Sequence, residues 1–152
     1  EEEQYVQNHL LITSSLYGVI PALAPIAPHR LDFMTKLKVE KQSLKKLWTE
    51  TYGQAVADQE TLLSLLSSEF EDVFPKEVRD KMIRFKFMEE KDGKRKIHST
   101  ISKKARGQFL SYLIENHITK LSDIKQSSFS GFKFQENLSQ EREFVFVKKV
   151  DG

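Results

Sequence analysis

The stretch DKMIRFKFMEEKDGKRKIHSTIS, residues 80–102, decides the fold because a turn signal stands between two runs of alternating apolar residues. The dipeptide Asp92-Gly93 lies at its centre, and an Asp-Gly pair flanked by such runs is a strong signal for a β-hairpin. We therefore expect residues 82–89 and 95–101 to form an antiparallel hairpin. This hairpin should lead directly into a helix over residues 102–116.

The predicted helix begins in ISKKARGQFLSYLIENHITK, residues 101–120. Ser102 is a suitable N-cap, because a serine hydroxyl accepts a hydrogen bond from the first helical turn. Apolar residues recur at helical spacing along the stretch, which predicts one buried stripe. The stripe consists of Ala105, Phe109, Tyr112 and Leu113.

Cations crowd the start of this helix, where the helix dipole disfavours positive charge. Lys103, Lys104 and Arg106 follow one another closely, and residues 91–106 hold seven Lys or Arg against one Asp. That is a local net charge of +6 in a chain whose net charge is +2. Backbone N–H groups at a helix N-terminus bind anions, and nearby cations strengthen such a site. The pattern therefore predicts a phosphate-binding site.

The rest of the chain predicts a mixture of helices and strands without repeats or linkers. A helix is expected over residues 1–12, then an ordered proline-containing loop over 14–30, a strand over 30–39 and an amphipathic helix over 41–57. Residues 61–70 are compatible with a strand or a helix. A short helix over 121–126 and strands over 129–134 and 142–149 complete the prediction. We expect one α+β domain over residues 1–152, with mainly antiparallel pairing.

Composition restricts the class of protein. With 152 residues, 39% hydrophobic and 30% charged, the chain fits a single globular domain. It has no apolar run of the roughly 18 residues that span a membrane, so we expect a cytoplasmic protein. No cysteine is present and the four histidines are scattered, so neither a metal nor another cofactor is predicted. The chain opens on Glu1 without an initiator methionine, which favours a C-terminal part of a longer protein.

Four blocks of the sequence resemble a known family. KIHSTISKKARGQFLSYLIENHIT, residues 96–119, is similar to the K-x-x-S-x-x-x-K-K-A-R-G and I-E-N signature of the YaaA family, also called DUF328, of peroxide-stress proteins. SSLYGVIPALAPIAPHRLDF resembles its S-G-L-Y-G…P-Y-R-L-E block, LKKLWTE its L-Y-x-F-W-G-D block and LLSLLSSEF its I-N-L-A-S-x-E-Y block. The similarity extends over essentially the whole chain.

The chain departs from the family pattern at several polar positions. Where the family has Arg-Pro-Leu-Asp, residues 21–24 read Pro-Ala-Leu-Ala, and the usual Tyr and Gly are replaced by His29 and Thr49. The S-P-A-K-type motif of the family's N-terminal part has no match here. Any function of those groups in relatives is therefore altered or missing in this sequence.

The resemblance implies a mixed α/β fold with a basic cleft, binding of double-stranded DNA partly through a helix-hairpin-helix element, and protection against peroxide by limiting free intracellular iron. The turn over residues 115–120 is the candidate hairpin of that element, although Asn116 and Thr119 could instead be helix caps. The expected contacts to DNA phosphates are Lys103, Lys104, Arg106, Arg30, Lys96, Asn116, Lys120 and Tyr17.

Three alternatives stay open. The cations could point into solvent or pair with Glu69 and Asp72. The protein could also be an enzyme acting on a nucleotide or nucleobase, with Glu69 as base and with Lys104 and Arg106 as phosphate clamps. Tyr17 and Trp48 could stack on bases or belong to the core. The sequence predicts no oligomeric state.

Overall fold

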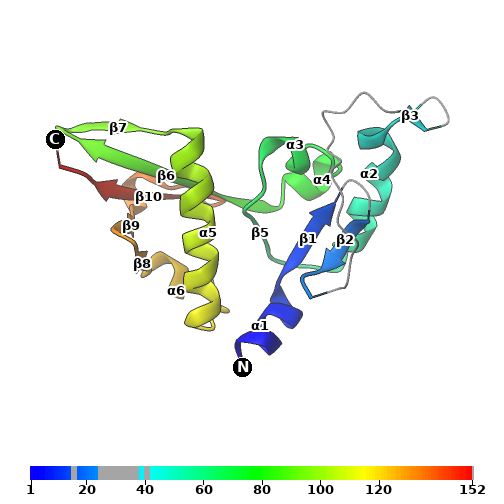
Figure 1. The fold of residues 1–152 in the computed structure, drawn as a ribbon, viewed down its shortest axis with the longest axis horizontal. Helices are drawn as coiled ribbons and strands as arrows, with labels where there is room; N and C mark the ends of the chain where they lie inside the picture. Colours follow the sequence, from blue (N-terminus) through cyan, green and yellow to red (C-terminus); the bar gives the residue numbers. More distant parts are fainter. Residues whose placement is uncertain (15–16, 24–37, 40–41, 152) are drawn as a thin grey trace. The chain divides into compact units, whose positions relative to one another are not determined.

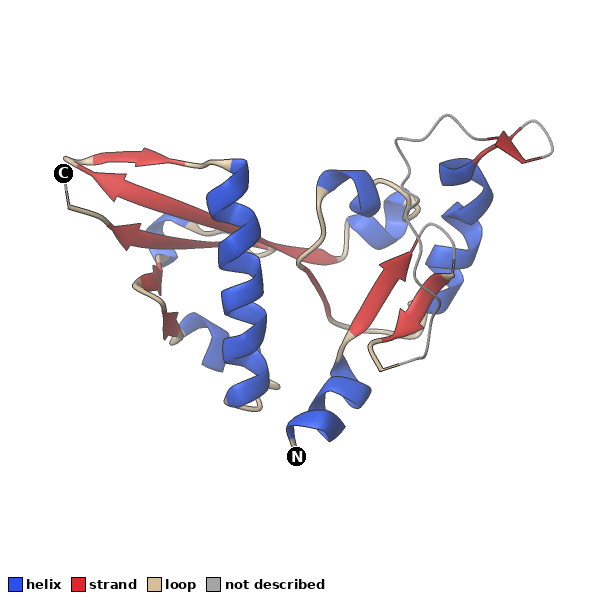
Figure 2. Cartoon of the chain, viewed as in Figure 1, coloured by secondary structure: helices blue, strands red, loops and turns tan. Residues whose placement is uncertain are grey.

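The computed structural model describes residues 1–14, 17–23, 38–39 and 42–151 (Figure 1). The described chain contains several helices and mostly antiparallel strands, so the predicted α+β fold class is confirmed (Figure 2). Its contacts form two compact units, one containing Glu3–Met82 and the other Ile83–Gly152. No helix in the described ranges is long and apolar enough to cross a membrane.

The first unit begins with a short helix and a two-stranded sheet. Helix α1 (Glu2–His9) leads into β1 (Leu11–Ser14), which pairs antiparallel with β2 (Gly18–Pro21). The predicted first helix is thus correct, but it ends before Leu11. Strand β2 lies inside the predicted loop over 14–30. Residues 24–37 fall outside the described ranges, and with them most of the predicted strand over 30–39. Its last two residues form β3 (Lys38–Val39), paired with β4 (Gln42–Ser43).

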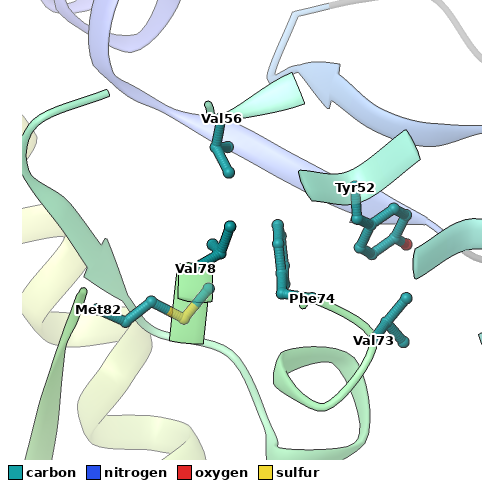
Figure 3. Close-up of a cluster of buried hydrophobic side chains, with 6 residues drawn as sticks. All are labelled: Tyr52, Val56, Val73, Phe74, Val78 and Met82. Carbon is teal, nitrogen blue, oxygen red and sulfur yellow. The ribbon is translucent and has the colours of Figure 1, made fainter. Parts of the chain in front are cut away.

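Helix α2 (Leu44–Ala55) contributes the fully buried Tyr52 to the first unit's core. Ser43 is its N-cap, and the Ser43 hydroxyl accepts a hydrogen bond of 3.2 Å from the Lys46 N–H. The ambiguous stretch over 61–70 contains both elements, strand β5 (Leu62–Ser64) and helix α3 (Ser68–Glu71), and is followed by α4 (Lys76–Arg79). Buried side chains from α2, from α4 and from the segments beside them meet in one cluster (Figure 3): Tyr52, Val56, Val73, Phe74, Val78 and Met82.

The second unit is built on the predicted hairpin. Strand β6 (Met82–Lys91) pairs antiparallel with β7 (Lys94–Lys96), and the turn residues Asp92 and Gly93 have positive φ values of 52° and 76°. Positive φ at both central residues is the geometry for which Asp-Gly is selected, because glycine adopts it without strain. The hairpin is confirmed. Its second strand is shorter than predicted, since residues 99–101 are helical.

Helix α5 (Ser99–Glu115) corrects the predicted helix start. His98, not Ser102, is the N-cap, and the Ser102 N–H already donates a helical hydrogen bond of 2.9 Å to the His98 carbonyl. Ser99, Thr100 and Ser102 can all cap a helix, so side-chain chemistry alone does not place the start. The three cations Lys103, Lys104 and Arg106 therefore lie one turn further into the helix than the sequence suggested.

The C-terminal strands complete the sheet of the second unit. After α6 (Leu121–Lys125), the predicted strand over 129–134 is instead a hairpin of β8 (Ser128–Phe129) and β9 (Phe132–Phe134), with a turn at Ser130-Gly131. The 3₁₀ helix η1 (Glu136–Leu138) precedes β10 (Glu143–Lys149). Strand β10 pairs antiparallel with β9 and parallel with β6.

Helix α5 covers one face of this sheet through aromatic packing. The predicted stripe residues Ala105, Phe109 and Leu113 are buried, whereas Tyr112 is half-buried. The Phe109 ring centroid lies 5.7 Å from that of Phe87 on β6 and 5.4 Å from that of Phe146 on β10. This core fixes α5 and the β6–β7 hairpin to each other, and so it positions the cations that both elements carry.

Candidate nucleic-acid interface

The two units differ in charge. Residues 83–152 contain fifteen Lys or Arg against nine Asp or Glu, whereas residues 1–82 contain nine against thirteen. The excess of cations therefore belongs to the second unit, although the net charge of the whole chain is small. A local excess of this kind, rather than net charge, is the electrostatic mark of a surface that attracts phosphates.

A lysine-lined hollow lies on the β6–β7 hairpin. Cross-strand pairing sets Lys94 opposite Lys91 and Lys96 opposite Glu89, and alternate residues of a strand share one face. Three lysines are thereby brought to the same face. They line a hollow of about 410 Å³, whose full lining is Glu89, Lys91, Asp92, Lys94, Lys96, His98 and Val150.

On the opposite face of the hairpin, the charge of Arg95 is neutralised by Glu90. Arg95 alternates with Lys94 and Lys96, and its Nε donates a hydrogen bond of 3.2 Å to the Glu90 Oε1 across the strands. Arg95 therefore contributes less to the basic surface than the count over residues 91–106 suggests. The hollow-lining Lys91, Lys94 and His98 were not among the predicted contacts. The sequence held the signal for them, because a two-residue Asp-Gly turn fixes which residues are paired across the hairpin.

Helix α5 starts at the hollow. His98 lines the hollow and is also the N-cap of α5, and its side chain makes no cap hydrogen bond. The unpaired N–H groups of the first helical turn, which carry the positive end of the dipole, therefore lie next to the lysines of the hairpin. This combination can bind a phosphate. Phosphate binding at this helix start stays a prediction, and Lys96, not Lys103, is the predicted contact nearest to the helix start in sequence.

The predicted cations of α5 extend the basic surface along the helix. Lys103 and Lys104 are exposed, and Arg106 is half-buried. Gly107 follows on the exposed side, where a Cβ atom would meet no other atom within 4 Å. The open surroundings leave the two lysine side chains accessible to a large ligand such as a nucleic acid.

Asn116 and Lys120 lie at the far end of α5. Twelve residues separate Lys104 from Asn116, about 18 Å along a helix. The Asn116 Nδ2 donates a hydrogen bond of 2.9 Å to the Tyr112 carbonyl, and Asn116 is the C-cap of α5. The capping alternative is thus confirmed for Asn116, whereas Lys120 and not Thr119 is the N-cap of α6. Two helices joined by a turn are present, but a DNA-binding helix-hairpin-helix is not shown.

The remaining predicted residues belong to the first unit or fall outside the described ranges. Tyr17 is 38% exposed, and its N–H donates a hydrogen bond of 3.0 Å to the Ser14 Oγ. Arg30 lies outside the described residues. Glu69 is half-buried in α3, while Lys104 and Arg106 are in the second unit. The enzyme hypothesis, which needs these three residues together, stays a prediction.

Trp48 has a packing role in the first unit. Gly18 has a φ of +86°, and a Cβ atom there would lie 3.1 Å from the Trp48 Cζ3. Trp48 is half-buried and packs against the core cluster, and the buried Tyr52 donates its hydroxyl hydrogen to the Ser14 carbonyl. The core alternative for Trp48 is therefore favoured over stacking on bases. The family-like motif residues Ser14, Gly18 and Trp48 hold β1, β2 and α2 together.

The second unit of this α+β chain holds the excess of cations, and comparison with known proteins identifies the family. The family described as Peroxide stress protein YaaA matches residues 1–138. A UPF0246 protein of Streptococcus gordonii is 99% identical over 152 residues, which are 100% of this chain and 62% of that protein. A UPF0246 protein of Streptococcus sanguinis is 57% identical over 150 residues, with 99% and 62% of the two chains covered.

The chain therefore belongs to the YaaA family of peroxide stress proteins. A third relative, the UPF0246 protein SPN23F15130 of Streptococcus pneumoniae, is 56% identical over 149 residues, covering 98% of this chain and 62% of the relative. The chain spans 62% of the length of all three relatives. The resemblance inferred from the four sequence blocks is confirmed.

Proposed function

We propose that this chain contributes to the peroxide stress response by binding the phosphate backbone of duplex DNA in the cytoplasm. The observation that carries the proposal is the hollow of about 410 Å³ with Lys91, Lys94 and Lys96 at the start of α5. Lysine ammonium groups and helix N–H groups contact phosphate oxygens without reading base edges. Binding should therefore depend strongly on salt and weakly on DNA sequence.

Lys103 and Lys104 test the proposal directly. Because both side chains are exposed, Lys103→Gln/Lys104→Gln should weaken binding to every duplex sequence by a similar factor. The salt dependence should flatten as well, since each phosphate contact contributes about −0.9 to the slope of log K against log salt, and two lost contacts change it by about 1.8. The melting temperature should stay unchanged, because the helix dipole acts on charges in the first turn and these two lysines lie beyond that turn. Anisotropy titrations at several salt concentrations measure both effects.

The first unit offers a matched control. Lys45 and Lys46 are also adjacent, exposed and near the start of a helix, α2, but they belong to the unit with an excess of acidic residues. Lys45→Gln/Lys46→Gln should leave the slope and the affinity as they are. If both double variants flatten the slope equally, the effect comes from net charge and the assigned surface is wrong. If neither variant changes binding, α5 is not part of the interface.

The hollow needs its own variant. Lys94→Gln/Lys96→Gln removes two of its three lysines without touching a buried side chain. We expect a loss of affinity at least as large as that of the α5 double variant, since these two lysines lie beside the helix N-terminus. Unchanged binding of this variant beside weakened binding of the α5 variant would place the interface along the helix rather than at the hollow.

The proposed link to iron follows from the family resemblance. We extend the proposal to a role in limiting free intracellular iron, exerted through the DNA-bound protein. In cells that lack the full-length relative, the wild-type protein should lower free iron after peroxide exposure, and the α5 double variant should do so less. Free iron is measurable in whole cells by electron paramagnetic resonance. Equal iron levels with both proteins would separate the iron effect from DNA binding.

A further inference from the structure

We propose that a second hollow, on the opposite face of the β6–β7 hairpin, binds the phosphate backbone of a second DNA duplex, so that one chain bridges two duplexes. This inference rests on the proposed function, because it extends DNA binding from one surface to two. The second hollow has a volume of about 310 Å³ and lies within the second unit. Its cations are Arg95 on β7, Lys133 on β9 and Lys149 on β10.

The strand register places these cations on one face of the sheet. Arg95 is paired with Glu90, and Glu90 with Lys149, so the three residues lie in a row across β7, β6 and β10. Lys133 is paired with Val147, which stands two residues before Lys149 on β10. Directly paired residues share a face, and so do alternate residues of one strand. The register therefore brings side chains from four strands to the second hollow.

This face of the sheet is opposite to the one that α5 covers. Phe146 directly precedes Val147 on β10, and its ring centroid lies 5.4 Å from that of Phe109 on α5. Neighbouring residues of a strand point to opposite faces, so Val147 and the second hollow face away from α5. Arg95 alternates with lysines of the first hollow, the one at the start of α5. A duplex lying on one face cannot fill the other hollow, because the sheet stands between them.

Two lysines supply the net charge of the second hollow. Glu90 neutralises Arg95, with 3.2 Å between the Glu90 Oε1 and the Arg95 Nε. Lys133 and Lys149 are exposed, and neither forms an ion pair with a carboxylate in the described part of the chain. Their charges are therefore available to a ligand, and an ammonium group on a long side chain is a common contact for backbone phosphates.

The spacing of the cations favours a polyanion over a single small anion. Neighbouring strands lie about 4.8 Å apart and residues rise about 3.4 Å along a strand, which puts the backbone of Lys149 about 10 Å from Arg95 and about 8 Å from Lys133. Phosphates recur about every 3.4 Å along one strand of a DNA duplex. The cations are thus spread over a length that several phosphates of one strand occupy.

A capture experiment tests the bridge. One duplex is fixed to beads, and the protein must retain a second, fluorescent duplex on them. The protein is the full-length Streptococcus gordonii relative, which is 99% identical over this chain, with substitutions at the equivalent positions. Lys133→Gln/Lys149→Gln should capture at least about fivefold less of the second duplex than wild type, because phosphate contacts supply most of the affinity. Its affinity for a single duplex in solution should stay within about twofold, since the first hollow is intact.

Glu90→Gln should act in the opposite direction. It keeps the shape of the side chain, removes the one carboxylate that lines the second hollow in the described residues and frees the charge of Arg95. Capture of the second duplex should therefore rise by about twofold or more. Capture below that of wild type would contradict the assigned role of Arg95 and with it the second hollow as the site of the second duplex.

Lys45→Gln/Lys46→Gln is the control for net charge, and it should capture like wild type. The bridge is overturned if both double variants lose capture equally, or if Lys133→Gln/Lys149→Gln keeps it. Capture that appears only at concentrations at which the protein dimerises in sedimentation also overturns it, because two copies would then hold one duplex each. Binding of a single duplex without capture overturns the bridge and leaves the proposed function standing, whereas absence of any duplex binding overturns both.

Discussion

At the residue scale, two helical glycines show how local packing decides the effect of one methyl group. Gly107 in α5 is exposed, and a Cβ atom there would meet nothing within 4 Å. Gly53 in α2 is buried, and a Cβ atom there would lie 2.7 Å from the Pro75 Cγ. Sequence alone gives both residues the same helix penalty, so only the structure separates them.

Gly107→Ala and Gly53→Ala should therefore change stability in opposite directions. Alanine is favoured over glycine in a helix by about 0.5–1 kcal/mol, so Gly107→Ala should raise the melting temperature by about 1–4 °C. Gly53→Ala gains the same propensity but forces a rigid proline ring aside, and overpacking costs about 1–3 kcal/mol. Its melting temperature should fall. Thermal unfolding followed by circular dichroism checks both, and shifts of the same sign would refute the packing assigned to Pro75.

Tyr52 gives the first unit a defined pH dependence. Burial raises the pKa of Tyr52 to about 12, whereas tyrosine in an unfolded chain has a pKa of about 10. Between these pH values the unfolded state loses the proton and the folded state keeps it. The free energy of unfolding should therefore be undiminished below pH 10 and fall by about 1.4 kcal/mol per pH unit as the pH rises from about 10 to 12.

Tyr52→Phe isolates this contribution. At neutral pH the variant should be less stable than wild type by about 1–3 kcal/mol, because the buried Ser14 carbonyl loses its donor. Phenylalanine does not titrate, so the stability difference should shrink as the pH rises above 10. Urea unfolding of both proteins at pH 8 and pH 11 measures this difference. A difference that stays constant would show that Tyr52 ionises as readily in the folded state as in the unfolded one.

At the element scale, the sequence predicts long periodic elements and strong turns. The prediction is wrong where two short elements lie within one run of apolar residues. The helices predicted over 102–116 and 41–57 are found over 99–115 and 44–55, and the turn predicted at Asp92-Gly93 is found there, since periodicity and turn chemistry are local. The apolar residues of the run Phe129–Phe134 predict one strand, because they hide the Ser130-Gly131 turn. Strand β8 pairs with β9 across this turn, and β9 pairs with β10, a tertiary contact that local sequence does not contain.

The candidate site shows the same division between local and tertiary information. The run of cations over 91–106 was visible in the sequence, but the lysines that line the hollow are selected by the pairing of β6 with β7. The predicted N-cap Ser102 lies four residues beyond the observed N-cap His98, so the expected contacts Lys103 and Lys104 lie beyond the first helical turn, whereas the expected contact Lys96 lies just before it. The N-cap of α5 depends on where strand β7 ends, and the end of β7 is set by its pairing with β6.

At the scale of the whole molecule, the two units differ in net charge, which the net charge of the whole chain does not reveal. The second unit concentrates the cations and the first unit the acids, so a surface for DNA can exist in a protein of net charge +2. The first unit instead has exposed apolar residues at β1 and a core of its own.

Metal binding is also a property of the whole chain. The sequence has no cysteine, and in the described parts of the chain no group of three His, Asp or Glu side chains is placed to hold a metal ion. Sites for iron or zinc need three or four such ligands together. We therefore expect that the purified chain, incubated with iron(II) or zinc and then desalted, retains far less than one metal per chain in elemental analysis. One tightly held metal per chain would contradict this expectation, and comparison with His29→Ala would then show whether that histidine, which lies outside the described ranges, is a ligand.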